Sequence, residues 1–512
     1  MRSATTRRRS TTSEPELAPR VETSTAGRLF DALDANAVRY CHFKSNANVA
    51  AGVSGRTDLD LLVDSRESTL AEELLAGHGF KRLPAHPSRR YPGVEDFFAL
   101  DEDTGRLLHV HLHYRLIAGE RFFKDYRLPW EQEFLDARVV DQPTGIYVAH
   151  PELEWLLLAC RAALKIRWRD RVRAGGPRRR GEAGGMLSEH RWLAERADAA
   201  AVADHARGLL GARAAELVEL TLKDDLRLRR LMELRRELLR NPRIFRGHRR
   251  ISALGIRWSR ELTWIVGSVN RRYLHRPFAY RRSGSSGGIV IAVIGSDGAG
   301  KSSVTQALNS WLAPKVDVIQ IYFGSGQGRS SLLRLPLKLG LQLMRRRSGA
   351  PSLDPEARRT RDVSPSRALW AVLLAREKRG KLRMAMRARE RGFVVICDRY
   401  PQTAVGGVSD GPILWRWQES QTRLKRALAR WEREIYKLGE EIAPDVVVRL
   451  LVSPDAAAAR RPTDNPEELA FRTKLVKDLR FERARHGVID VDADDDLESV
   501  ILDVKRRLWP LI

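Results

Sequence analysis

The sequence of 512 residues contains few cysteines and no long apolar run. Its three cysteines, Cys41, Cys160 and Cys397, are odd in number and far apart, so they provide neither a disulfide framework nor the spacing of a zinc site. No stretch approaches the roughly 20 apolar residues that cross a bilayer, and the first residues lack the apolar segment of a secretory signal. These absences favour a reducing compartment, and we expect a cytoplasmic protein without a membrane span.

Acidic residues are scarce relative to basic ones. Lys and Arg total 91 against 65 Asp and Glu, which gives a formal net charge of +26 and a pI near 10.5. Such a charge attracts nucleic acid, anionic lipid or any polyphosphate. However, the abundance of arginine and alanine is also typical of a GC-rich genome, and neither an RNA-binding aromatic signature nor a zinc finger accompanies the charge. We therefore do not expect specific nucleic-acid binding.

Composition and periodicity divide the chain into five regions. They are a Ser-, Thr-, Arg- and Pro-rich tail expected to be disordered (1–25), a small α+β domain (26–150), a helical region (151–280), a Gly- and Ser-rich linker (281–288) and a region of alternating strands and helices (289–512). The alternation predicts an α/β fold with a parallel sheet in the last region. The helical region contains a Gly- and Arg-rich loop, 173–185, that we expect to be mobile. Whether this region is a spacer, an interface or part of an active site remains open.

The most specific motif lies at the start of the last region. Residues 295–302 read Gly-Ser-Asp-Gly-Ala-Gly-Lys-Ser, which matches the phosphate loop G-x-x-x-x-G-K-[ST], between an apolar run and a predicted helix. This context places backbone N–H groups and the positive end of a helix around a phosphate. We expect ATP to bind at Gly295, Ser296, Asp297, Gly298, Ala299, Gly300, Lys301, Ser302 and Ser303. Lys301 would reach the β- and γ-phosphates and Ser302 would ligate Mg²⁺, whereas a glycine-rich turn without a ligand is the alternative.

Two later strands deliver charged residues to the same edge of the predicted sheet. The apolar run 393–397 ends in Asp398 and Arg399, at the carboxyl end where open α/β sheets bind ligands. Asp398 can hold Mg²⁺ through water and Arg399 can clamp a phosphate, although a strand-end carboxylate that caps a helix or pairs with Arg399 is also possible. The strand 445–452 leads into a helix with Arg460 and Arg461, which could fold over bound ATP.

In this order, the three motifs resemble those of thymidylate kinases and their nucleoside-monophosphate kinase relatives, over residues 288–512. The resemblance implies that the loop holds the donor phosphates, that Arg399 grips the phosphate of the acceptor, and that Arg460 or Arg461 stabilises the transferred charge. Asp297 matches an acidic residue that lies near the acceptor sugar in that family. The resemblance also implies ATP and Mg²⁺ as cofactors, a phosphorylated small-molecule acceptor such as a nucleoside monophosphate, and a homodimer.

One segment departs from that family. Thymidylate kinases carry an Arg-Glu-Pro-Gly-like segment after their second strand, whereas residues 319–331 of this chain read Ile-Gln-Ile-Tyr-Phe-Gly-Ser-Gly-Gln-Gly-Arg-Ser-Ser. Tyr322 and Arg329 could bind another phosphorylated or glycosylated molecule, or the segment could be an ordinary flexible loop. The basic segment 332–365 that follows could be an insertion or a lid. The identity of the acceptor therefore remains open.

The α+β domain carries a second candidate site. Asp58 and Asp60 lie two residues apart on a predicted strand, 57–63, so both carboxylates project from one face and suit Mg²⁺. Ser45 lies thirteen residues before Asp58. This pattern resembles the nucleotidyltransferase superfamily, which has a Gly-Ser turn before Asp-x-Asp and a third carboxylate on a later strand. Here Lys44 replaces the glycine.

The later strand, 107–113, carries histidines in place of that carboxylate. Alternation places His109, His111 and His113 on one face, where His111 could act as a metal ligand or a proton acceptor. We favour hydrogen-bonded, half-exposed strand residues instead, because spacing alone does not make three side chains converge. The leading hypothesis is an ATP- and Mg²⁺-dependent phosphotransferase. The alternatives are a bifunctional nucleotidyltransferase and kinase, and a non-catalytic ATP-binding module.

Overall fold

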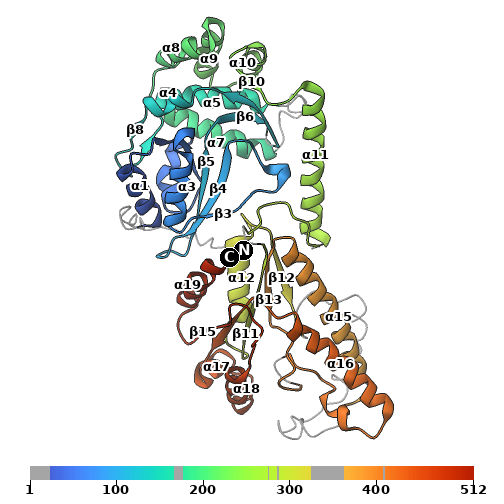
Figure 1. Cartoon of the computed structure of the whole chain (residues 1–512). Coiled ribbons are helices and arrows are strands. Elements are labelled where there is room, and N and C mark those ends of the chain that lie inside the picture. Colours follow the sequence, from blue (N-terminus) through green and yellow to red (C-terminus); the bar gives the residue numbers. More distant parts are fainter. Residues whose placement is uncertain are drawn as a thin grey trace, which may run out of the picture.

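The computed structural model describes residues 24–120, 122–166, 177–274, 276–284, 287–324, 363–407 and 410–512. In Figure 1, an N-terminal sheet with its helices forms one half of the molecule, and a second sheet with its helices forms the other. Among these residues, every helix is too short or too polar to traverse a lipid bilayer.

The C-terminal half contains a five-stranded parallel sheet, which confirms the predicted α/β arrangement. Its strand order is β12-β13-β11-β14-β15. The strands are β11 (Ile289–Gly295), β12 (Val318–Tyr322), β13 (Val394–Asp398), β14 (Val446–Leu451) and β15 (Val488–Asp492). Runs of β-branched residues form the central strands, as expected where a parallel sheet is covered on both faces.

Alternate residues of β11 pack against different helices. Ile291 belongs to a core shared with α12 and α19, whereas Ala292 belongs to a core shared with α15 and α16. The helices of this half are α12 (Lys301–Leu312), α15 (Pro365–Glu390), α16 (Arg423–Glu441), α17 (Pro454–Arg460), α18 (Pro466–Asp478) and α19 (Leu497–Leu508). Because β11 lies between β13 and β14, the loop that follows it opens at the middle of the sheet edge.

The N-terminal half contains a mixed seven-stranded sheet of order β3-β4-β5-β2-β1-β9-β8 and a three-stranded sheet of order β10-β7-β6. In the larger sheet, β2 is parallel to β5, so Asp60 is opposite His111, and β4 is antiparallel to β5, so Asp96 is also opposite His111. The strands are β1 (Tyr40–His42), β2 (Leu59–Val63), β3 (Lys81–Arg82), β4 (Val94–Leu100), β5 (Leu107–His113), β6 (Leu116–Glu120), β7 (Phe123–Leu128), β8 (Val139–Val140), β9 (Tyr147–Val148) and β10 (Phe245–Arg246).

Helices surround these sheets, and several differ from the sequence predictions. They are α1 (Thr25–Ala35), α2 (Val49–Val53), α3 (Ser68–Gly77), α4 (Glu131–Asp136), α5 (Pro151–Lys165), α7 (Pro177–Ala194), α8 (Ala199–Leu210), α9 (Ala212–Lys223), α10 (Leu228–Arg240) and α11 (Arg250–Val269). The predicted tail is wrong at its end, because the Ser24 hydroxyl accepts a hydrogen bond from the Gly27 N–H and caps α1. Residues 1–23 lie outside the described residues.

The predicted mobile loop 173–185 is also wrong from residue 177 onward. There α7 begins, and its proline occupies a first-turn position that suits that residue. Residues 173–176 lie outside the described ranges, as do 325–331 of the altered kinase segment, with Arg329, and 332–362 of the basic segment. Strand β2 begins at Leu59, so Asp58 precedes it, and the sequence analysis missed β4.

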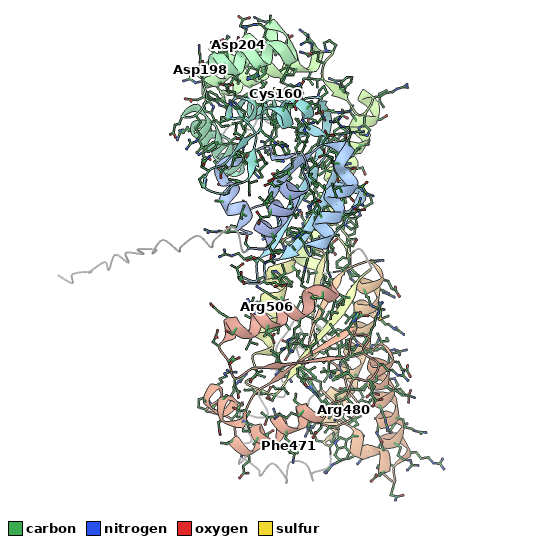
Figure 2. The ribbon with its side chains drawn as sticks, turned by 60° about the vertical axis from the view of Figure 1, so that its left-hand side comes forward. Cys160, Asp198, Asp204, Phe471, Arg480 and Arg506 are labelled. Atoms are coloured by element: carbon green, nitrogen blue, oxygen red, sulfur yellow. The ribbon has the colours of Figure 1, made fainter. Side chains whose placement is uncertain are left out.

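The two halves of the molecule are in direct contact. Phe98 and Leu100 of β4 belong to the same core cluster as Trp509 and Ile512 at the end of the chain. The Lys81 Nζ donates hydrogen bonds to the carbonyl oxygens of Trp509 (2.7 Å) and Pro510 (2.8 Å). Nearby, Arg506 donates to the Glu102 carbonyl oxygen at the junction seen in Figure 2.

Helix α11 has an unusual orientation. Its Arg257 contacts Glu120 at 2.8 Å, and its Arg260 donates to the carbonyl oxygen of Arg90 at 3.1 Å, so charged side chains face the protein. Seven of its large apolar side chains are exposed, the reverse of an ordinary surface helix. These are Ile251, Leu254, Trp258, Leu262, Ile265, Val266 and Val269. Figure 1 shows the helix along one edge of the molecule.

Candidate functional site

The phosphate loop joins β11 to α12 at the carboxyl edge of the parallel sheet. Gly298 and Gly300 have φ angles of 88° and 83°, a backbone conformation that favours glycine. At Gly298, a Cβ would also lie 3.2 Å from the carbonyl oxygen of Ala457 in α17. The glycines of the motif therefore serve both the turn and the close approach of α17.

Lys301 is the first residue of α12 and is only 6% exposed. Its Nζ donates a hydrogen bond to the Ser296 carbonyl oxygen at 2.5 Å and lies 3.9 Å from Oδ1 of Asp297. Burial, and secondarily the positive charge of Arg399, lower the pKa of Lys301 to about 8. A bound anion would therefore stabilise the charged form of this buried amine.

Ser302 and Asp398 are brought together as the sequence predicts. The Ser302 hydroxyl donates to Oδ2 of Asp398 at 3.0 Å. Asp398 is 4% exposed, burial raises its pKa, and its buried Oδ1 has no hydrogen-bond partner among the described residues. A hydroxyl and a carboxylate with an unused oxygen are ligands that Mg²⁺ prefers. These two residues could therefore hold the ion.

Arg399 lies across the loop from these residues. One Nη donates to Oδ1 of Asp297 at 2.9 Å and the other to Oδ2 of Asp410 at 3.3 Å. Arg472 of α18 binds the second oxygen of Asp297. Neither Asp410 nor Arg472 was found from the sequence, because neither belongs to a motif. Two guanidinium groups are thus held on one loop carboxylate.

Arg460 and Arg461 lie beside the same loop. Arg460 donates to the carbonyl oxygens of Ala493 (2.7 Å), Asp494 (3.3 Å) and Gly298 (3.4 Å), so it ties α17 to the loop. Both arginines line a cavity of about 490 Å³ with Arg399 and the loop from Asp297 to Ser303. The structure therefore gathers most of the predicted residues around one cavity; Gly295, Ser296 and Asp398 do not line it, and Asp398 contacts it through Ser302.

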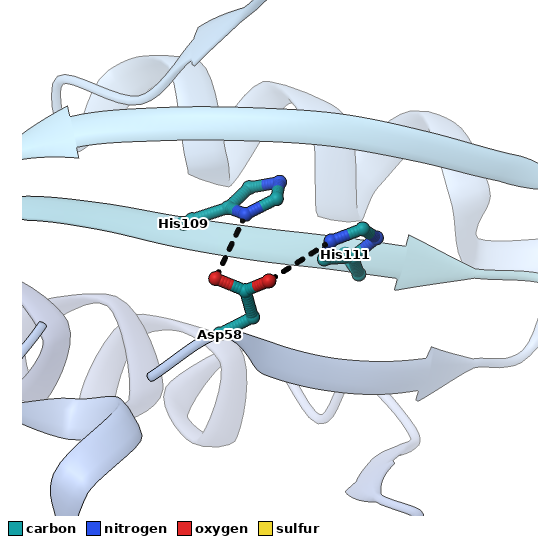
Figure 3. Close-up of side chains that lie close together, drawn as sticks. All are labelled: Asp58, His109 and His111. Carbon is teal, nitrogen blue, oxygen red and sulfur yellow. Dashed lines mark ion pairs between the residues drawn. The ribbon is translucent and has the colours of Figure 1, made fainter. Parts of the chain in front are cut away.

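The N-terminal candidate residues also come together. As Figure 3 shows, Asp58 lies between His109 and His111, with oxygen to nitrogen distances of 3.1 and 3.4 Å. Asp60 lies 3.6 Å from His113. The expectation of half-exposed histidines that do not converge is wrong, because His109 and His113 are 2% and 1% exposed. The parallel register of β2 and β5 brings the acidic and histidine faces together.

Two sets of side chains in this cluster have ligand atoms close enough together to hold a metal ion. They are Asp58 with His109 and His111, and Asp60 with His111 and His113. Burial lowers the pKa of His111 to about 4 and that of His113 to about 3, so both rings are neutral. Mixed nitrogen and oxygen donors suit a transition metal better than Mg²⁺. However, lysines already neutralise the carboxylates: Lys315 binds Asp58, and Lys44 lies 2.8 Å from Asp60.

Other partners in this region were missed. Asp96 on β4 supplies a third carboxylate, which lies 3.0 Å from His109 and 2.9 Å from Arg282. Its place directly before the apolar run 97–100 was an available signal. Ser45, the residue of the nucleotidyltransferase-like turn, donates through its N–H (3.1 Å) and hydroxyl (3.3 Å) to Glu189 of α7. A carboxylate therefore occupies the backbone and hydroxyl donors of this turn.

Comparisons with known proteins find similarity over less than half of the chain. No family model matches. Two Escherichia coli K12 proteins named as uncharacterized ATP-binding proteins, YghR and YghS, are 28% identical over 226 and 228 residues, which is 43% of this chain and 86% and 93% of theirs. Among solved structures, thymidylate kinase from Ehrlichia chaffeensis is similar with 17% identity and a TM-score of 0.25, over 43% of this chain and 98% of its own. Deoxyadenosine kinase from M. mycoides, with bound dATP, has a TM-score of 0.26.

The loop geometry makes a stability prediction. We expect Gly298→Ala to lower the free energy of unfolding by about 1–2 kcal/mol, because alanine at positive φ is strained and its Cβ would press on α17. As a control, Gly380→Ala in α15, where no atom beyond the surrounding helix backbone lies within 4 Å of the new Cβ, should raise it by up to about 1 kcal/mol. Chemical denaturation measures both. A Gly298→Ala protein as stable as the parent would contradict the described loop.

Proposed function

We propose that this chain is an ATP- and Mg²⁺-dependent phosphotransferase of the nucleoside-monophosphate kinase type, whose acceptor is a phosphorylated small molecule. One observation carries the proposal: Lys301 and Ser302 begin α12 at the edge of a parallel sheet, and Ser302 is hydrogen-bonded to the buried Asp398 on the neighbouring strand. The ATP-binding names of two relatives that are 28% identical support it.

Catalysis of phosphoryl transfer depends mainly on positioning and charge stabilisation, and different residues of this site would provide each. Lys301 and the N-terminal N–H groups of α12 bind the donor phosphates. Ser302 and Asp398 would hold Mg²⁺, which would neutralise phosphate charge. Arg399 grips the acceptor phosphate, which replaces Asp297 as its partner, and Arg461 faces the donor. Arg460 keeps the loop in place through the Gly298 carbonyl oxygen.

The division of the chain into a nucleotidyltransferase-like domain (26–150), a helical region (151–280), a linker (281–288) and a kinase-like domain (289–512) belongs to the same proposal. Residues 289–512 have about the length of the match to the ATP-binding relatives. Nucleotidyl transfer by the N-terminal domain is the weaker alternative, because Glu189 engages Ser45 and lysines engage Asp58 and Asp60.

Turnover tests the proposal directly. We expect Lys301→Ala to lower Mg²⁺-dependent ATP consumption by about 100-fold or more, the loss typical of one positioned charge-stabilising donor. The measurement uses a panel of nucleoside monophosphates and phosphosugars as acceptors. Lys437→Ala, which removes an exposed lysine of α16, is the matched control. Turnover that survives Lys301→Ala would refute the proposed site, and ATP binding without turnover for any acceptor would favour a binding module.

The pKa of Lys301 predicts a pH dependence. Because this pKa is about 8 without ligand, the ammonium form that binds polyphosphate is already present below pH 8. Above it, binding must take up a proton, since the phosphates raise the pKa of the amine. We expect ATP affinity to fall by up to about tenfold per pH unit above 8. Calorimetry in two buffers of different ionisation enthalpy measures the uptake, which must disappear in Lys301→Ala.

A homodimer formed through α11 completes the proposal. Its exposed residues Ile251, Leu254, Trp258, Leu262, Ile265 and Val269 follow steps of three, four, four, three and four residues. Such an 11-residue period keeps one apolar stripe facing a partner helix along the whole 20-residue helix. A second copy related by a two-fold axis offers the same stripe and covers it.

Solution mass tests the dimer. We expect light scattering after size exclusion to give twice the chain mass for the parent and one chain mass for Leu262→Glu, because a buried charge at the contact is costly. Leu424→Glu is the matched control, since Leu424 of α16 is 68% exposed and Leu262 is 61% exposed. A monomeric parent, or dimers that survive Leu262→Glu, would exclude this contact.

A further inference from the structure

A second cavity lies between the N-terminal sheet, α11 and the segment that enters β11. It measures about 380 Å³, within the range of small-molecule sites. Its wall includes Pro314, just beyond the end of α12, so the 12-residue helix separates it from the phosphate loop by roughly 18 Å. Seven basic side chains line it, namely those of Arg89, Arg90, Lys124, Arg260, Arg271, Arg281 and Arg282.

Carboxylates do not balance these cations. Among the described residues that line the cavity, Glu95 and Asp96 are the only carboxylates, and each already has basic partners. Glu95 lies 2.8 Å from Arg82, and Asp96 lies 2.9 Å from Arg282. Asp317 is close by, but one of its oxygens accepts the backbone N–H groups of Tyr280 and Arg281, each at 2.8 Å. The cavity therefore concentrates positive charge.

The excess of positive charge affects the buried guanidinium group of Arg281. Its Nη1 is buried and has no hydrogen-bond partner within the described ranges. Burial, followed by repulsion from Arg271 and Arg89, lowers the pKa of Arg281 to about 10. A buried guanidinium nitrogen without an acceptor is costly, and an anion would remove both the repulsion and the missing hydrogen bond.

Aromatic rings hold the cations in place. The Tyr280 ring lies 5.2 Å from the guanidinium carbon of Arg89 and 5.0 Å from that of Arg271. The Tyr91 ring lies 4.9 Å from that of Arg260 and 5.1 Å from the Lys124 ammonium. Cation–π contacts of this kind fix side chains that would otherwise separate by repulsion. The positive wall is thus preorganised.

We propose that this cavity is a second ligand site, independent of the phosphate loop, which binds a small molecule carrying at least two linked phosphate groups. Planar guanidinium groups on separate elements, Arg89, Arg271 and Arg281, can each engage a different phosphate oxygen. His111, which contacts Asp58, also lines the cavity. The bound phosphates therefore lie next to the Asp–His cluster of the N-terminal sheet.

The test uses pyrophosphate as the probe and calorimetry on the full chain that carries Lys301→Ala, so that its outcome does not depend on the phosphotransferase proposal. We expect pyrophosphate still to bind at one site, more tightly than orthophosphate. Adding Arg271→Ala should weaken that binding by about tenfold or more, as expected for loss of a charged hydrogen-bond donor. Arg281→Ala should do the same without lowering the melting temperature, because its removal relieves repulsion.

Arg272→Ala is the matched control, since it removes an adjacent, exposed arginine that does not line the cavity. It should leave pyrophosphate affinity nearly unchanged. Equal weakening by Arg271→Ala and Arg272→Ala would mean diffuse surface attraction and would overturn the proposal. Loss of all binding in Lys301→Ala alone, or orthophosphate binding as tight as pyrophosphate binding, would overturn it as well.

Discussion

The ion pair between Lys315 and Asp58 links the two halves of the molecule at the N-terminal Asp–His cluster, and the rest of this junction is built around it. Asp58, Asp60 and Asp96 are brought close together by neighbouring strands, and carboxylates in such surroundings require cations or hydrogen-bond donors. The C-terminal half supplies two of those cations, Lys315 just beyond α12 and Arg282 just before β11. The elements on either side of the phosphate loop are therefore anchored to the N-terminal sheet.

Charge is distributed unevenly along this junction. On the side of Asp58, histidines and lysines saturate the carboxylates, whereas on the side of Arg281 the cations outnumber the acids. The formal net charge of +26 is thus not only a diffuse surface property, because part of it is concentrated in a cavity. Local excess charge of this kind attracts an oppositely charged ligand more strongly than the same charge spread over a surface.

The phosphate loop also holds charged groups in fixed positions. Lys301 and Asp398 are both buried, and each has its pKa shifted toward the neutral form by burial. Asp297 meanwhile binds two guanidinium groups, from Arg399 and Arg472. The charged groups are fixed before any ligand arrives, which reduces the reorganisation that binding requires.

The parallel sheet, the phosphate loop and the strand 107–113 could be predicted from local sequence patterns, because periodicity, glycine spacing and apolar runs act over a few neighbouring residues. The same patterns also placed Ser302 and Asp398 at one edge, since carboxyl ends of parallel strands coincide. The convergence of the three histidines, the contact of Asp96 with His109, and the contacts of Glu189 with Ser45 and of Arg472 with Asp297 could not be predicted in this way. Those contacts join residues from distant parts of the chain, and their geometry depends on strand register and on packing between the halves, which no local pattern encodes.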